Sequence, residues 1–153
     1  IHDLSGRLLF QKAQAVLAAG ERDGRELAKS EARELAVEAW RACPPRGEPL
    51  SFIRRIDALK SPTAAEWRVT VRCLPGEEGR EEGIEGYFLT AWAVADTVEE
   101  AVEYISAMEP PFLGTVEELE EHERLRSAPG ELKGLVAASG RGFFGGDDAE
   151  DAP

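Results

Sequence analysis

The sequence predicts a small α+β domain in which helices pack on an antiparallel sheet. Apolar residues recur at helical spacing up to about residue 42, and the period then changes to the alternation of strands. Helical spacing with capping residues returns after residue 96. This order predicts an N-terminal helical hairpin, a three-stranded antiparallel meander, two helices packed on one face of that sheet, and an acidic C-terminal tail.

The first two predicted helices span residues 4–19 and 24–42. Leu9, Val16 and their neighbours form an apolar stripe on the first helix, and Gly20 follows where a helix would end. Asp23 stands three residues before Glu26, which is a capping-box pattern for the second helix. Prolines at positions 44 and 45 end it.

Three strands are predicted next, over residues 51–59, 66–74 and 86–95. In the second strand Trp67, Val69 and Val71 alternate with polar residues, which is typical of a half-buried strand. The third strand is apolar on both faces, so we expect a central position in the sheet. Between these two strands, residues 75–86 carry four glycines and five acids and predict a solvated loop.

The last predicted helices span residues 97–108 and 115–126. Thr97 with Glu100 and Thr115 with Glu118 each form a capping box. We expect residues 1–130 to form one domain and residues 131–153 to form a Gly-rich acidic tail. The residues expected in the core are Trp40, Val69, Val71, Leu89, Val102 and Ile105.

The charge is unevenly distributed along the chain. The net charge is −12, with 13 Lys/Arg against 10 Asp/Glu in residues 1–74 and 5 against 20 in residues 75–153. This asymmetry favours a protein partner with a basic surface, because clustered charge steers association. The acidic half should repel a phosphate backbone, so we do not expect nucleic-acid binding.

The common catalytic and metal-binding motifs are missing, so we expect no cofactor and no metal, and we name no catalytic residues; a catalytic set assembled from residues distant in sequence stays open. Residues 140–145 match the dinucleotide pattern G-x-G-x-x-G, but only eight residues follow, which leaves no room for the helix that the pattern requires. Glu118 and His122 are four residues apart, yet a third metal ligand is missing. Cys43 and Cys73 have neither metal nor disulfide-framework spacing, and we expect reduced thiols in a cytoplasmic protein.

Two resemblances concern the middle of the chain. The predicted order helix–strand–strand–strand–helix over residues 23–108 resembles double-stranded-RNA-binding domains, but Asp96, Glu99 and Glu100 stand where that family carries lysines. Asp96-Thr-Val-Glu-Glu-Ala101 is similar to the strand-to-helix exit of HicB-type antitoxins, over those six residues. Neither resemblance assigns a family or a function.

We therefore predict a non-enzymatic, acidic protein-interaction module of the immunity, antitoxin, adaptor or accessory-subunit type. The alternatives are a small enzyme, or an accessory subunit of one, with a site on the open sheet face, and a single-stranded nucleic-acid binder. The chain has no transmembrane pattern, and its start, Ile1-His2-Asp3, indicates a trimmed chain. Arginines beside aromatics favour binding, and the candidate partner-binding residues are Arg68, Arg72, Phe88, Trp92, Phe143 and Phe144.

Overall fold

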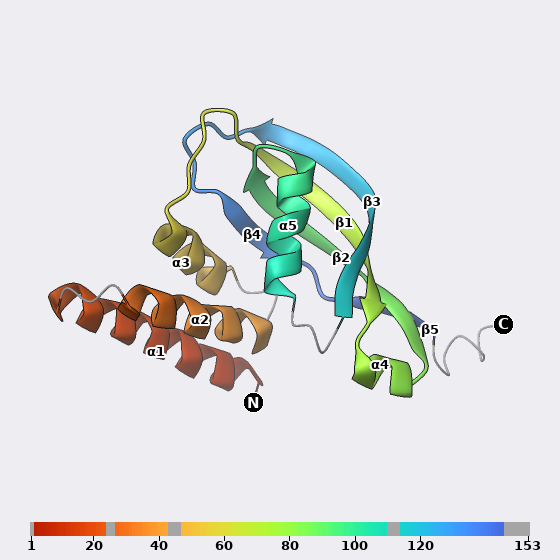
Figure 1. The fold of residues 1–153 in the computed structure, drawn as a ribbon, viewed down its shortest axis with the longest axis horizontal. Coiled ribbons are helices and arrows are strands. Elements are labelled where there is room, and N and C mark those ends of the chain that lie inside the picture. The colour runs from red at the N-terminus through yellow and green to blue at the C-terminus, as the bar shows by residue number, and fades with distance from the viewer. Residues whose placement is uncertain (1, 24–26, 43–46, 110–113, 146–153) are drawn as a thin grey trace. The chain divides into compact units, whose positions relative to one another are not determined.

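A computed structural model describes residues 2–23, 27–42, 47–109 and 114–145 of the chain (Figure 1). The chain divides into two compact units, residues 1–59 and 60–153. The sequence predicts one domain over residues 1–130, whereas the structure separates three helices from the sheet. The division also separates the charge: the first unit carries 10 Lys/Arg against 9 Asp/Glu, and the second carries 8 against 21.

The first unit consists of α1 (His2–Asp23), α2 (Leu27–Ala42) and α3 (Glu48–Asp57). α1 and α2 pack along each other, and α2 also contacts α3 (Figure 1). The rings of Phe10 and Phe52 meet edge to face at 5.4 Å between centroids. Arg33 donates two hydrogen bonds, of 2.7 and 3.0 Å, to the carboxylate of Asp57. The ring contact joins α1 to α3, and the ion pair joins α2 to α3.

The strand predicted over residues 51–59 is wrong, because this segment is helix α3. Pro49 stands in its first turn, where its fixed φ favours a helix. Ala58 ends the helix in a left-handed conformation, at φ 51°, and donates its backbone N–H to the Arg54 carbonyl. Phe52 and Ile53 are adjacent and both buried, which a helix achieves and an alternating strand does not. The order expected for a double-stranded-RNA-binding domain is therefore absent.

The second unit is built on a five-stranded antiparallel sheet, which confirms the predicted α+β class. Its strands pair in the order β3-β1-β2-β4, and β5 pairs with another part of β2. Two helices accompany the sheet: α5 contacts β1, β2, β3 and β4, and the short α4 lies in the connection that was predicted to be a loop. The bounds are β1 (Ala65–Pro75), α4 (Glu77–Glu81), β2 (Ile84–Ala95), α5 (Val98–Met108), β3 (Gly114–Ser127), β4 (Gly134–Ala138) and β5 (Gly142–Gly145).

The helix predicted over residues 115–126 is also wrong, because this segment is edge strand β3. Val116, Leu119 and His122 are spaced by three, which suggests a helix, yet they pair with Cys73, Val71 and Val69 of β1. Two register shifts each insert an extra residue between them, so all three side chains face the same side of the sheet. The bulged strand thereby imitates helical spacing. Of the two helices predicted after residue 96, the described part of the second unit contains only α5.

The predicted tail, residues 131–153, is partly structured. β4 and β5 both add to β2, whose long edge offers backbone hydrogen bonds to each of them. Strands of five and four residues are too short to give a clear local pattern, so only their pairing defines them. The acidic residues from 146 onward lie outside the described residues.

The core of the second unit lies between α5 and the sheet face that α5 covers. Val69, Val71 and Leu89 from the sheet and Ile105 from α5 are buried, as predicted. Val102 was predicted to be buried with them, but it is half-buried because it lies toward the side of the helix. Trp40, the core residue predicted in the first unit, is buried.

Candidate functional site

The sheet face opposite α5, called the outer face here, carries alternating arginine, threonine and aromatic side chains. Directly opposite residues in an antiparallel pair share a face. Register places Arg68 opposite Trp92 and Arg72 opposite Phe88. Thr70 and Thr90 lie between these pairs, and their hydroxyl oxygens are 2.8 Å apart. This face therefore combines two cations with two aromatic rings.

Edge strand β3 supplies the counter-charges. Its five glutamates, called the acidic edge here, are Glu117, Glu118, Glu120, Glu121 and Glu123.

Both outer-face arginines form ion pairs with the acidic edge. Arg72 donates to Glu118 at 2.6 Å, and its Nε lies 3.3 Å from Glu117. Arg68 pairs with Glu123. These pairs are solvent-exposed, so each contributes little to stability, but a phosphate group would have to compete with them. The arrangement therefore weighs against a nucleic-acid platform.

Between β1 and the acidic edge the surface is hollowed. The hollow has a volume of about 450 Å³ and combines both signs of charge. Its lining residues are Arg68, Thr70, Glu120, Glu121, His122 and Glu123. Such a polar, open hollow suits side chains of a protein partner more than a small apolar ligand, which needs an enclosed pocket.

The aromatic candidates divide between the two faces of the sheet. Phe144 of β5 lies opposite Gly86 on the outer face, and its ring centroid is 5.1 Å from that of Phe88. Phe143 lies on the other face against Tyr87, at 5.3 Å between centroids. Phe88 and Phe143 are 41% and 51% exposed, which is unusual for phenylalanine. The outer face thus gathers five of the six predicted residues, and Phe143 stands apart from them.

A buried polar cluster on the α5 side has no counterpart in the sequence analysis. Glu109, which follows α5, is 4% exposed and accepts a 2.6 Å hydrogen bond from the Tyr87 hydroxyl. Arg141 donates two further hydrogen bonds to the same carboxylate, each of 3.0 Å. The three residues come from β2, the end of α5 and the β4–β5 connection, so no local motif reveals them. Their pairing neutralises a buried carboxylate, which would otherwise be costly.

Cys73 lies beside this cluster and is chemically protected. Burial raises the pKa of its thiol to about 11, and the neighbouring Tyr87 hydroxyl lowers it only in part. Burial and the hydrogen bond to Glu109 also raise the pKa of Tyr87. Both groups therefore stay protonated near neutral pH, and neither is an activated nucleophile.

We expect Cys73 to be inert toward thiol reagents in the folded protein. In a Cys43→Ser variant, Cys73 should react with DTNB roughly a hundredfold more slowly than in denaturing urea, because reaction requires opening of the core. Equal rates in the two conditions would show that the thiol is exposed. The measurement is the absorbance increase of released thiolate.

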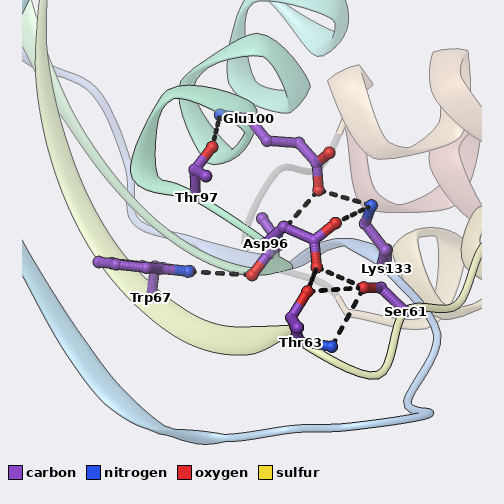
Figure 2. A network of polar contacts seen from close by, with 8 residues as sticks. Ser61, Thr63, Trp67, Asp96, Thr97, Glu100 and Lys133 are labelled. Atoms are coloured by element: carbon purple, nitrogen blue, oxygen red, sulfur yellow. Dashed lines mark hydrogen bonds and ion pairs between the residues drawn. The ribbon is translucent and has the colours of Figure 1, made fainter.

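A second polar network holds the junction between β2 and α5 (Figure 2). Asp96 accepts hydrogen bonds from Ser61 at 2.5 Å and from Thr63 at 2.8 Å. Lys133 lies 3.1 Å from Asp96 and 2.8 Å from Glu100. The network joins the segment before β1, the β2–α5 turn and the segment before β4, so it fixes one end of the sheet.

This network has the residue types of a Ser–Lys catalytic pair but not the chemistry. Hydrogen bonds that the Lys133 amine donates to Glu100 and Asp96 raise its pKa above the usual value, so the amine remains a cation and cannot act as a base. Hydrogen bonds from Ser61, Thr63 and Lys133 lower the pKa of Asp96, which keeps its carboxylate ionised. The carboxylate that accepts from Ser61 is therefore a weak base, and we interpret the arrangement as structural.

The described residues form neither a metal-binding cluster nor a membrane-spanning helix. No group of three or more His, Cys, Asp or Glu side chains is placed to hold a metal ion within the described part of the chain. Among the helices of that part, none is both long enough and apolar enough to cross a membrane.

Comparisons with protein-family models, with curated protein sequences and with solved structures find no significant match.

Proposed function

We propose that this protein is a non-enzymatic interaction module that binds a basic protein partner through the acidic edge. The observation that carries this proposal is the position of the five glutamates on an exposed strand, fourteen residues long, at the border of the sheet. An edge strand offers unpaired backbone groups to another chain, and charged side chains decide which chain can approach.

The charge of the whole second unit supports the same partner. Its 8 Lys/Arg against 21 Asp/Glu produce a negative field that extends beyond the acidic edge. Such a field accelerates the approach of a basic surface and repels a second copy of the same unit. The bulges in β3 also protect the unit from self-association, because they interrupt the regular hydrogen-bond ladder that edge-to-edge aggregation requires.

The exposed aromatic rings on the outer face can serve as anchors that slow the dissociation of a bound partner. Rim charges mainly set the association rate, whereas aromatic anchors that become buried set the dissociation rate. Phe88 is exposed and lies on the same face as the two arginines, so a partner that covers the acidic edge and β1 would also reach it.

A matched pair of charge variants tests this proposal. The triple variant Glu118→Gln, Glu121→Gln and Glu123→Gln should slow association with the captured partner about tenfold at low ionic strength and leave dissociation nearly unchanged. The control removes three charges from α4, by Glu77→Gln, Glu78→Gln and Glu81→Gln, and should have little effect. The partner is first captured with the unmodified protein, and kinetics are then measured on a sensor surface at two ionic strengths.

Equal association rates for the two triple variants would contradict the proposal, since net charge alone would then explain the steering. Association that is insensitive to salt would contradict it as well, because exposed charges are screened by salt.

A further inference from the structure

Strand β5 pairs with residues 84–88 of β2 (Figure 1). Phe144 lies opposite Gly86, and a Cβ atom at Gly86 would stand 2.7 Å from the Phe144 ring and 2.7 Å from the Cys73 carbonyl oxygen. The bare backbone at Gly86 therefore makes room for an aromatic ring. The neighbouring Phe88 ring borders this space.

Phe144 is one side chain that β2 recognises, and Arg141, three residues before it, is a second. Arg141 meets the buried carboxylate of Glu109 through two parallel hydrogen bonds, a geometry that only a guanidinium provides. Its guanidinium carbon also lies 6.0 Å from the centroid of the Tyr87 ring. The edge of β2 over residues 84–88, together with Glu109, thus selects an arginine followed by an aromatic ring.

β5 itself is short and only partly buried. It has four residues, glycines stand at both of its ends, and half of the Phe143 surface remains exposed. Fixing each backbone residue costs about 1–2 kcal/mol in conformational entropy. The partial burial of the β5 side chains offsets this cost only narrowly. Segments of this kind open locally without global unfolding.

We propose that the edge of β2 over residues 84–88 is a binding site for an extended protein segment, which β5 occupies as a detachable intramolecular ligand. The segment adds to β2 as an antiparallel strand. It carries an arginine for Glu109 and, three residues later, an aromatic side chain for the space over Gly86. This site is on the opposite side of β2 from β1 and the acidic edge, so the inference does not rest on the proposed function.

Because β5 is attached to the chain, it competes with any free segment for the edge of β2. The attached β5 competes with an effective concentration on the order of millimolar, so a free segment must bind more tightly than β5 or meet a chain whose β5 is weakened. Weakening β5 while keeping Glu109 intact should therefore reveal the site.

The experiment uses the full chain and a fluorescent peptide that reproduces residues 139–145, Ser-Gly-Arg-Gly-Phe-Phe-Gly. The Arg141→Gln variant should bind this peptide at least about tenfold more tightly than the unmodified chain, because its own strand has lost the guanidinium while Glu109 remains. Replacing the arginine of the peptide by glutamine should remove the gain. The control Arg126→Gln changes an exposed arginine that pairs with Glu131 and should leave the peptide affinity unchanged. Fluorescence anisotropy gives the affinities.

If the Arg141→Gln variant is folded and binds the peptide no more tightly than the unmodified chain, the proposal is overturned. If that variant does not fold, hydrogen exchange of the unmodified chain decides. Amides of β5 that exchange at least about tenfold faster than those of Val69 and Val71 support detachment. Amides of β5 that exchange only at the rate of global unfolding overturn it.

Discussion

Replacing Ile105 by alanine should destabilise the protein by about 2–5 kcal/mol. Ile105 lies on the face of α5 that packs on the sheet, and it is almost fully buried. Its truncation removes apolar contacts and leaves a cavity that neighbouring side chains from two different elements cannot fill completely. Urea denaturation followed by circular dichroism measures the free energy of unfolding.

The control for this prediction is Leu74→Ala. Leu74 belongs to β1 but is exposed, so its truncation should cost less than about 1 kcal/mol. An unchanged denaturation midpoint for Ile105→Ala would mean that α5 does not pack on the sheet through this face.

Replacing Tyr87 by phenylalanine should cost about 1.5–3 kcal/mol, since it removes a hydrogen bond to an ionised, buried group. The Tyr87 hydroxyl donates to Glu109 at 2.6 Å, and neither residue has access to water that could replace the lost donor. Arg141 remains as a partner of Glu109, which limits the loss. The free energy of unfolding is again the measured quantity.

A double-mutant cycle with Glu109→Gln separates this hydrogen bond from general packing. The loss caused by Tyr87→Phe should be smaller in the Glu109→Gln background, because a neutral amide accepts a weaker hydrogen bond than a carboxylate. Equal losses in the two backgrounds would show that Tyr87 and Glu109 are not coupled.

Of the two capping boxes predicted after residue 96, one starts a helix and the other does not. The capping box at the start of α5 forms as predicted, with the Thr97 hydroxyl accepting from the Glu100 backbone N–H at 3.2 Å. The Glu100 carboxylate in turn accepts from the Asp96 backbone N–H at 3.1 Å. The identical pattern at Thr115 and Glu118 does not start a helix. Capping residues stabilise a helix that packing already favours. The apolar stripe after Thr115 is thin, so a helix there would bury little apolar surface.

The candidate site was predictable only in part. Strict alternation in β1 and β2 places Arg68, Arg72, Phe88 and Trp92 on one face wherever those strands pair, so the sequence is sufficient for that grouping. The position of Phe144 beside Phe88 depends on which strand β5 joins. Four residues carry too little local preference to specify a partner strand, and the free edge of β2 decides it.

The sequence by itself determined the α+β class, the uneven charge and the alternating faces of the two central strands, because composition and short-range period are properties of the chain alone. The tertiary structure decided that residues 114–127 form a strand and that residues 48–57 form a helix. It also brought Tyr87, Glu109 and Arg141 together. Long-range pairing and burial contribute more free energy than the small intrinsic preferences of single residues, so they override local patterns wherever the two disagree.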